Sequence, residues 1–485
     1  MQLRRNETVP ITETYQYHAN RYPQKTAVQI DEMSVSYLEW HQLVCRTAGW
    51  LSAKKTKNKR MAFSLPNGLP FLQLFAGAAM AGWTAVPFDP RWSPSECREK
   101  LSLCKAELFI SDQPFPDLEQ TLLLNECLDE INHALVLEPR TFDDEPFYIG
   151  FTSGSTGAPK AFIRSHRSWI ESFRISSRDF QLSAGDSVVI PGSLFFSHFL
   201  YGAMTTLYLG GTVYLLKKFS PSRLENAVAR NPVTTLFTVP TMTEALRAEN
   251  RRIDKPVKVI SSGANWSRQA KKAIQKAHPH LSLFDFYGTS EMSFVSVSAP
   301  EDFHVKPDSV GRPFHNVDVA IRSSSGEAVR TGEVGKIFVK SPMLFSGYLQ
   351  EAAAASPIDE NGWMTVDDMG WMDEDGYLFI TGRENSMIVY GGINIFPEEV
   401  EGVLLSHPEV EEAAVIGIRD DYWGEKAAAV IKGKAPVKEL KTYCKSRLAP
   451  YKVPRMWHYL EQIPHTSGGK VARHLLKEQL QDVIR

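Results

Sequence analysis

The sequence has little cysteine, almost no net charge and no long uninterrupted apolar run. Its 485 residues include five cysteines, no two of them in CxxC spacing. This argues against a disulfide framework or a zinc site and favours a reducing, cytoplasmic setting. Lysine and arginine together number 54 against 56 acidic residues, so we expect no binding of nucleic acid or of an anionic membrane.

The most apolar stretch, residues 71–88, is the one candidate for a membrane span. It is rich in alanine rather than leucine, and four residues interrupt it: Gln73, Gly77, Gly82 and Pro87. We therefore expect a buried segment of a globular protein and no transmembrane segment. The N-terminus has two arginines without an apolar run behind them, so no signal peptide is predicted.

What the sequence has in quantity is an alternation of short apolar runs with amphipathic segments. The runs typical of strands are 186–192, 211–216, 234–240, 258–263 and 281–288. Residues 222–230 and 267–278, which lie between them, have the pattern of helices. This order predicts an α/β fold with parallel sheets, in which ligands bind beyond the carboxyl ends of strands.

The composition and the pattern of apolar residues change twice in the second half of the chain. From residue 309 the sequence is glycine-rich with short alternating strands, which predicts a β-barrel-like or hairpin layer. The last hundred or so residues have a strand–helix pattern of their own, which predicts a compact α+β domain starting near Arg383.

The most distinctive loop lies within residues 150–164, GFTSGSTGAPKAFIR. Its glycines, small hydroxyl residues and lysine suit a phosphate-binding nest of backbone N–H groups. The P-loop pattern requires Gly-Lys-Ser/Thr, whereas here Gly157 precedes Ala158, Pro159 and Lys160, so that pattern fails. Composition alone leaves phosphate binding and a plain surface loop both open.

The segment TSGSTGAPK, with Tyr148 upstream, resembles the signature loop of the adenylate-forming superfamily of acyl-CoA synthetases, luciferases and adenylation domains. Further motifs follow in family order over residues 10–480, and the likeness is greatest to bacterial acyl-CoA ligases. These motifs are YPQKTAVQIDEMSVSYLEW (22–40), AGAAMAGWTAVPFDPRWSPSE (76–96), YGTSE (287–291), GRP (311–313), GEVGKIFVKSPMLFSGY (332–348), GRENSMIVYGGINIFPEEVE (382–401) and PHTSGGK (464–470).

The resemblance implies a reaction in two halves. A carboxylate first attacks the α-phosphate of ATP to give acyl-AMP and pyrophosphate, and the thiol of CoA then attacks the acyl carbon. It also implies a large N-terminal domain over residues 1–382 that binds ATP and the acyl group, a hinge at 383–386 and a small mobile C-terminal domain over 387–485. Both halves develop negative charge that the protein must stabilise, and neither requires a protein nucleophile.

By the same resemblance, ATP or AMP contacts come from the loop and from later motifs. The implied residues are Thr152, Ser153, Gly154, Ser155, Thr156, Gly157, Lys160, Gly263, Ala264, Asp285, Tyr287, Gly288, Thr289, Asp368, Arg383 and Lys470. Among them, Tyr287 stacks on adenine and Asp285 accepts from the adenine amino group. Asp368 accepts both ribose hydroxyls, which suits a group with two oxygens.

Three residues are implied in catalysis: Lys470, Glu291 and His198. Thr152 and Glu291 flank Mg²⁺, which prefers one or two protein oxygens together with phosphates and water. Lys470 reaches into the site from the small domain and holds the carboxylate and α-phosphate oxygens together. His198 gates the acid and thiol channels, with a buried core histidine as the open alternative.

The remaining implied residues concern the acid, the thiol and the hinge. The acyl pocket is assigned to Phe196, His198, Phe199, Tyr201 and Met292. No Asp lies between residues 191 and 211 to pair an amino group, so an apolar acid such as a fatty acid is expected. Gly391 and Gly392 line the thiol tunnel, where a side chain would block the pantetheine arm, and Asn385 is the hinge residue.

Three positions depart from the family pattern. Val366-Asp367 stands where Thr-Gly usually precedes the ribose aspartate, Asn385 replaces an Asp or Lys, and Ala161 replaces the Gly after the loop lysine. Val366-Asp367 and Asn385 keep one alternative open, a non-catalytic relative that binds nucleotide or acyl groups. A second alternative, an enzyme that loads the thiol of an acyl carrier protein, stays open because the sequence has no readable motif for a CoA-nucleotide site.

Overall fold

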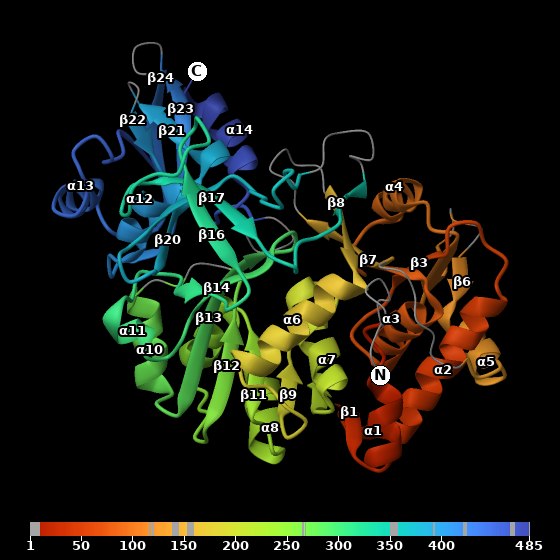
Figure 1. The fold of residues 1–485 in the computed structure, drawn as a ribbon. Helices are drawn as coiled ribbons and strands as arrows, with labels where there is room; N and C mark the ends of the chain where they lie inside the picture. Colours follow the sequence, from red (N-terminus) through yellow and green to blue (C-terminus); the bar gives the residue numbers. More distant parts are fainter. Residues whose placement is uncertain are drawn as a thin grey trace.

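The computed structural model describes residues 10–115, 118, 121–137, 145–152, 160–263, 266, 268–349, 357–390, 393–420, 424–465 and 471–484. Two large sheets with helices between and outside them form the N-terminal body, and two smaller sheets lie above them (Figure 1). The prediction of layered parallel α/β sheets followed by a small C-terminal layer is confirmed.

The first large sheet contains the five strands predicted from the alternation. Its order is β15 (Arg312–Pro313), β14 (Ser293–Ser298), β13 (Leu281–Thr289), β12 (Val257–Ser261), β11 (Thr235–Thr238), β9 (Ser187–Ile190), β10 (Thr212–Leu215), β1 (Thr26–Ile30) and β2 (Met33–Ser36). The strands from β13 to β1 run parallel, and antiparallel strands border them at both ends.

The second large sheet carries the loop motif. Its order is β18 (Gly347–Tyr348), β8 (Lys160–Ser165), β7 (Pro146–Thr152), β4 (Thr84–Phe88), β3 (Arg60–Ser64), β5 (Leu108–Ser111) and β6 (Thr121–Leu123). β7 and β8 form an antiparallel hairpin, and the short strand β18 adds to its outer edge. A segment 180 residues later in the chain thus lies beside the loop motif.

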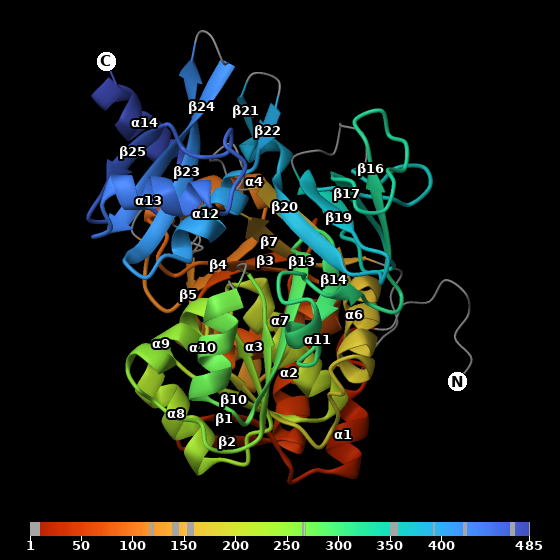
Figure 2. The same cartoon turned by 90° about the vertical axis from the view of Figure 1, so that its left-hand side faces the viewer.

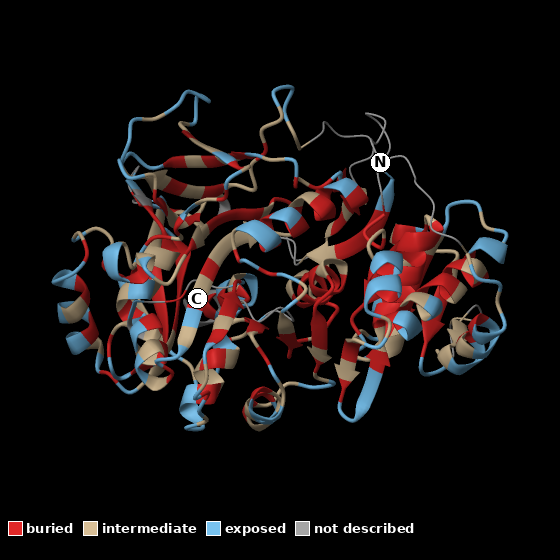
Figure 3. Ribbon diagram, turned by 60° about the horizontal axis from the view of Figure 1, so that its bottom comes forward, coloured by how far each residue is buried: buried red, intermediate tan, exposed pale blue. Residues whose placement is uncertain are grey.

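Helices fill the space between the two sheets and cover their outer faces. One apolar core joins both sheets to α2 (Tyr37–Ala53), α3 (Leu69–Ala81), α6 (His166–Arg178) and α7 (Ser197–Leu209) (Figure 3). The outer helices are α1 (Tyr15–Arg21), α4 (Pro94–Cys104), α5 (Leu124–Asn132), α8 (Pro221–Arg230), α9 (Pro240–Ala248), α10 (Arg268–Ala277) and α11 (Asp302–Val305).

The apolar stretch 71–88 forms the buried helix α3 and strand β4, as predicted. Within the part of the chain that the structure describes, none of the helices has both the length and the apolar character that a bilayer crossing requires.

Residues after 309 form an antiparallel layer, in the order β16 (Asp318–Arg322), β17 (Gly335–Lys340), β19 (Asp368–Met372) and β20 (Leu378–Arg383). The hairpin layer is confirmed, but the barrel-like closure is wrong for the described residues, because β16 and β20 are not paired with each other. Four short strands are too few to close a sheet around packed side chains.

The C-terminal layer follows the short 3-10 turn η2 (Glu384–Ser386) and lies next to the four-stranded sheet (Figure 2). It contains β21 (Ile388–Tyr390), β22 (Ile393–Ile395), β23 (Val410–Asp420), β24 (Gly424–Gly433), β25 (Met456–Tyr459), α12 (Pro397–Leu405), α13 (Val437–Lys445) and α14 (Arg473–Ile484). Its two apolar clusters contain only residues from 388 onward. It thus has apolar cores of its own. The domain boundary near Arg383 stays a prediction.

Candidate active site

Three residues predicted to bind the nucleoside meet where β13 approaches the four-stranded sheet; we call them the Asp368 cluster (Tyr287, Asp368 and Arg383). Asp368 and Arg383 are register partners on β19 and β20, and Arg383 Nε donates to Asp368 Oδ1 at 2.9 Å. The Tyr287 hydroxyl donates to Asp368 Oδ2 at 2.6 Å. Because a carboxylate has about four acceptor positions, Asp368 keeps capacity for ribose hydroxyls.

The electrostatics of the Asp368 cluster keep Tyr287 and Arg383 in their ordinary protonation states at neutral pH. Burial, followed by the neighbouring Asp368, raises the pKa of the Tyr287 phenol well above its usual value. Burial acts to lower the pKa of Arg383, but Asp368 outweighs it and the pKa is raised. Tyr287 therefore remains a donor and Arg383 a cation, and both orient the carboxylate.

The described residues on the phosphate side meet around a tyrosine; we call them the phosphate-side cluster (Thr152, Lys160, Glu291 and Tyr348). Thr152 and Lys160 face each other across the β7–β8 hairpin. The Lys160 ammonium lies 4.8 Å from the centre of the Tyr348 ring, and the Tyr348 hydroxyl donates to Glu291 Oε1 at 2.8 Å. The hairpin and the YGTSE motif are thereby joined through one side chain.

The oxygens of this cluster fit a magnesium ion. Glu291 is 8% exposed, and the one hydrogen bond from Tyr348 leaves its carboxylate with acceptor capacity. The Thr152 hydroxyl lies 3.5 Å from the Lys160 carbonyl oxygen, at the limit of a hydrogen bond. A carboxylate and a loosely held hydroxyl are the one or two protein oxygens that Mg²⁺ prefers beside phosphates and water.

Arg164 on β8 was not among the residues predicted from the sequence. Its hydrogen bonds join two distant segments of the phosphate side. It is 3% exposed, and its guanidinium donates to the carbonyls of Ser290 at 2.9 Å and Met343 at 2.8 Å. Burial lowers its pKa to about 10, against the opposing effect of Tyr148 and Glu291, so it stays charged at neutral pH. The sequence holds no signal for this, since its partners are 126 and 179 residues away.

Asp285, predicted to accept from the adenine amino group, is already engaged by an unpredicted partner. Lys271 on α10 lies 3.1 Å from Asp285 Oδ2, and both side chains are buried. Burial raises the pKa of Asp285 although Lys271 opposes this effect. Lys271 lies one helical turn before the buried Ile274, so the two side chains share the buried face of α10. The adenine contact stays a prediction, and it has to share the carboxylate with Lys271.

The other described residues of the predicted nucleotide site lie at or just after strand ends. Gly263, which follows β12, has a φ of +98°, in the region that favours glycine. A Cβ on Gly288 would lie 2.0 Å from the carbonyl oxygen of Ser293, so this position near the end of β13 excludes side chains. The Thr289 hydroxyl accepts from the Met292 backbone N–H at 3.1 Å and holds the same turn.

The predicted acyl-pocket residues divide into two groups. Phe196 and His198 at the start of α7 are partly exposed, whereas Phe199, Tyr201 and Met292 are buried in the core at 4%, 7% and 0% exposure. The Tyr201 hydroxyl donates to the Ser172 carbonyl at 2.7 Å, so it points into the packing between α6 and α7. This placement favours core packing for the buried three, and their pocket role stays a prediction.

His198 is held in a neutral state beside the parallel sheet. Its Nε2 lies 2.8 Å from the Thr238 carbonyl and therefore donates, which leaves Nδ1 as an acceptor; among the described residues this buried atom has no hydrogen-bond partner. Burial lowers the pKa of His198 to about 4, although the Thr238 carbonyl opposes this. A neutral ring surrounded by Phe199, Phe237 and Phe286 suits a wall or gate better than a proton carrier.

Some predicted site residues lie outside the described residues: Ser153, Gly154, Ser155, Thr156, Gly157, Ala264, Gly391, Gly392 and Lys470. The backbone of Asn385 lies in η2, where the hinge was predicted. The roles of all these residues stay predictions.

Comparison with known proteins decides the family. The family model described as AMP-binding enzyme matches residues 15–349, and the AMP-binding enzyme C-terminal domain matches residues 399–470. This chain belongs to the AMP-binding enzyme family.

Relatives and solved structures of this family agree in length and fold with the chain. It is 53% identical to the protein named uncharacterized acyl–CoA ligase YhfT of Bacillus subtilis, over 98% of this chain and 99% of that protein. It is 29% identical to the 2-succinylbenzoate–CoA ligase of Bacillus subtilis, over 94% and 95% of the two chains. The Bacillus subtilis o-succinylbenzoate CoA synthetase bound to the acyl-adenylate OSB-AMP has a TM-score of 0.89, with 28% identity over 97% and 98%.

These comparisons confirm the prediction of an AMP-forming acid–thiol ligase that uses ATP, magnesium and CoA. The same Bacillus subtilis synthetase has been solved with ATP and a magnesium ion, at a TM-score of 0.87 and 27% identity over 98% of this chain and 100% of that chain. The substrates of such ligases are small molecules, as the sequence predicts.

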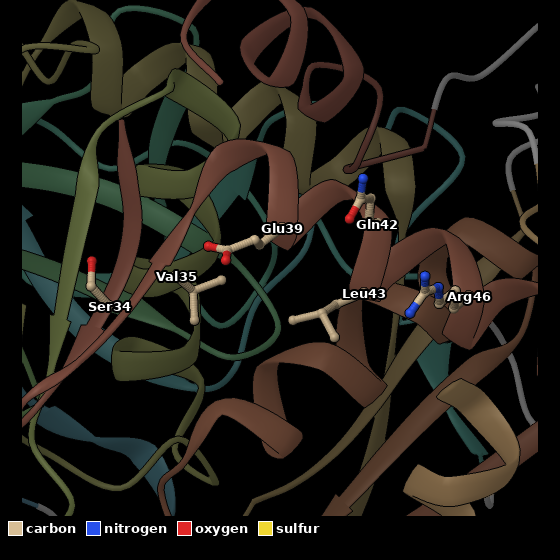
Figure 4. Close-up of a pocket in the computed structure, with 6 residues that line it drawn as sticks. All are labelled: Ser34, Val35, Glu39, Gln42, Leu43 and Arg46. Carbon is tan, nitrogen blue, oxygen red and sulfur yellow. The ribbon is translucent and has the colours of Figure 1, made fainter. Parts of the chain in front are cut away.

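A shallow pocket of about 250 Å³ on α2 and β2 lies apart from both clusters of this AMP-binding enzyme (Figure 4). It is lined by Ser34, Val35, Glu39, Gln42, Leu43 and Arg46. The Glu39 carboxylate accepts from the backbone N–H and the hydroxyl of Ser36 at the start of α2. That capping role accounts for the acidic side chain, so the pocket is not an alternative active site.

Proposed function

We propose that this AMP-binding enzyme activates an apolar carboxylic acid as its acyl-adenylate and transfers the acyl group to CoA, with the predicted residues in the roles given above. The observation that carries the proposal is the junction of the two clusters. Tyr287 of the Asp368 cluster lies in β13, and Glu291 of the phosphate-side cluster lies two residues beyond its carboxyl end, so one segment, YGTSE, contributes to both clusters. The nucleoside and the phosphates of one ATP molecule thus have neighbouring sites.

In the first half-reaction, a carboxylate oxygen of the acid forms a bond to the α-phosphorus, and the bond to the β-phosphate oxygen breaks. Pyrophosphate leaves with the electron pair. Asp368 and Arg383 hold the ribose, while Lys160 and the backbone of the preceding loop stabilise the leaving charge. Glu291 and Thr152 would hold magnesium, which would supply positive charge beside the phosphates. Lys470 is proposed to hold the attacking carboxylate against the α-phosphate.

In the second half-reaction, the sulfur of CoA attacks the acyl carbon, the carbon–oxygen bond to AMP breaks, and the thiol proton passes to solvent. Negative charge moves onto the AMP phosphate. The small domain is proposed to rotate about Asn385 so that Gly391 and Gly392 line the thiol tunnel. His198, neutral and fixed by Thr238, is proposed to separate the two channels.

The acid is proposed to be apolar, with a fatty acid as the leading class. Phe196 and His198 form a partly exposed aromatic entrance at the start of α7. No aspartate lies among residues 191–211 to pair an ammonium group. A cytoplasmic location is also proposed, because the five cysteines are buried free thiols.

A substrate panel tests the function. Pyrophosphate release is measured with ATP, Mg²⁺ and short- to long-chain fatty acids, aryl acids, α-amino acids and 2-succinylbenzoate, with and without CoA. We expect release with apolar acids and thioester formation only when CoA is present. Hydroxamate formation with hydroxylamine but no thioester with CoA would instead indicate a carrier-protein thiol as acceptor.

Substitution of Lys470 tests the division between the half-reactions. We expect Lys470→Ala to abolish adenylation but to leave transfer from preformed acyl-adenylate to CoA largely intact, because the lysine acts on the α-phosphate only in the first step. Equal loss in both assays would contradict the assigned role.

A further inference from the structure

Tyr348 lies between the cation and the carboxylate that the phosphate side offers to ATP. Its hydroxyl donates to Glu291 Oε1 at 2.8 Å, while the Lys160 ammonium faces its ring at 4.8 Å from the centroid. The ring thus contacts both charged side chains. We propose that Tyr348 is a positioning residue for magnesium·ATP, which orients the Glu291 carboxylate and keeps it from pairing with Lys160. This proposal rests on the proposed function.

Coulomb attraction gives the reason for such a spacer. Two opposite charges in contact inside a partly desolvated site attract each other strongly, and a direct Lys160–Glu291 pair would satisfy both groups without ATP. The aromatic ring binds the ammonium through its face and the carboxylate through its hydroxyl. The carboxylate is held in place while it keeps acceptor capacity for a metal ion, and the ammonium is held against the ring rather than against the carboxylate.

The backbone around Tyr348 is fixed strongly enough for this role. Gly347 and Tyr348 form β18, which pairs with Ile163 and Phe162 of β8. The Phe345 N–H donates to the Glu291 carbonyl at 2.8 Å, which ties the tyrosine segment to the carboxylate segment directly. Arg164 adds its bonds to the carbonyls of Ser290 and Met343, one residue before Glu291 and five before Tyr348. Both segments therefore share one buried anchor.

The chain contains a matched control for the same chemistry at another place. The Tyr377 hydroxyl donates to Asp302 Oδ1 at 2.7 Å, and the Arg312 guanidinium lies 4.3 Å from the centre of its ring. Tyr377 thus also joins a carboxylate to a cation, but it contacts neither cluster of the site. Removal of the Tyr377 hydroxyl therefore measures how much the loss of such a hydrogen bond destabilises the fold, separately from any effect on ATP binding.

The experiment measures binding of Mn²⁺·ATP, with Mn²⁺ in place of Mg²⁺, by electron spin resonance and calorimetry to the full-length protein. We expect Tyr348→Phe to weaken Mn²⁺·ATP binding about tenfold, because partners of metal ligands typically change metal affinity by that factor or more. Tyr348→Leu, which also removes the spacer, should weaken it about a hundredfold. Binding of ATP without metal should change less than threefold in Tyr348→Phe, and Tyr377→Phe should leave both affinities unchanged.

Each outcome decides the proposal. Unchanged Mn²⁺·ATP binding by Tyr348→Phe overturns it, as does an equal loss with and without metal. An equal loss in Tyr377→Phe would assign the effect to general stability, which denaturant unfolding of both variants checks. Recovery of adenylation by Tyr348→Phe at tenfold higher Mg²⁺ would support the positioning role. If the unaltered protein binds no Mn²⁺·ATP, the proposed function fails rather than the role of Tyr348.

Discussion

The two sides of the candidate site are held by different forces. The phosphate-side cluster rests on Arg164, which is 3% exposed and donates to backbone carbonyls of distant segments. The Asp368 cluster rests on an ion pair between neighbouring strands, in which the Arg383 side chain is 43% exposed. A buried arginine that holds backbone carbonyls fixes its surroundings, whereas an ion pair with one half-exposed partner is screened by solvent on that side and contributes less.

The proposed hinge lies on the less constrained side. Lys336 on β17 donates to Asp367 at 3.1 Å and lies 2.6 Å from Glu384 Oε2, so it bridges the residue before β19 and the first residue of η2. Burial acts to lower the pKa of Lys336, but Glu384 and Asp367 outweigh it and the pKa is raised. These ion pairs are partly exposed. They suit the domain rotation proposed between the half-reactions, because partly exposed ion pairs are easily broken and formed again.

Substitution of Arg164 is expected to reduce the free energy of unfolding more than any other change considered on the two sides of the site. Arg164→Met leaves two buried carbonyls without donors and should reduce the free energy of unfolding by about 3–5 kcal/mol. Arg383→Met, where the arginine is half-exposed but Asp368 is buried and keeps its hydrogen bond from Tyr287, should cost less, about 1–2 kcal/mol. Urea denaturation of the two variants measures the difference, and equal losses would show that the two sides are built alike.

Substitution of Asp368 should affect nucleotide binding more than stability. Asp368→Asn removes the charge that strengthens two hydrogen bonds to ribose, so the KM for ATP should rise about a hundredfold in the pyrophosphate-release assay. Asp367→Asn, one residue earlier, is the control and should change this KM less than threefold. A similar rise in both variants would indicate that Asp368 was not correctly chosen as the ribose residue.

Acid should weaken the rigid side through His166, which directly follows β8. Burial lowers the pKa of His166 from 6.5 to about 3 in the folded protein. Between pH 7.5 and 5 the unfolded chain gains a proton there that the folded protein does not, so stability falls as pH falls, by about 2 kcal/mol. His166→Gln should remove that part of the slope in denaturation curves, whereas substitution of the exposed His133 should not.

The smallest effect is expected at Asp367 beside the hinge. Asp367 has a φ of +63°, a conformation that glycine adopts without strain, and the family usually has glycine there. Asp367→Gly should therefore stabilise the protein slightly, by less than about 1 kcal/mol, because the lost contact with Lys336 offsets part of the gain. Thermal unfolding measures the change, and a clear loss of stability would show that the ion pair outweighs the strain.

Much of the fold follows from local sequence because its signals are local. The five strands predicted from the alternation, β9 to β13, have apolar runs of strand length, and helices between them have amphipathic spacing. The motif order predicted the family. It also favoured Asp368 over its neighbour Asp367 as the ribose residue, and the carboxylate of Asp367 points instead toward Lys336. The barrel closure was wrong because alternation predicts strands but not which edges pair.

The sequence by itself determined the fold class, the family and the chemistry of the reaction, since motifs carry residue types at fixed spacing. Only the tertiary structure decided which polar and charged groups are partners. Arg164 pairs with two carbonyls, Asp285 with Lys271, and Tyr348 with Lys160 and Glu291. These contacts join residues from 14 to 188 positions apart. The periodicity of one segment does not indicate which distant segment will pack beside it. Burial then sets their protonation, because desolvation depends on what packs around a group rather than on its neighbours in the chain.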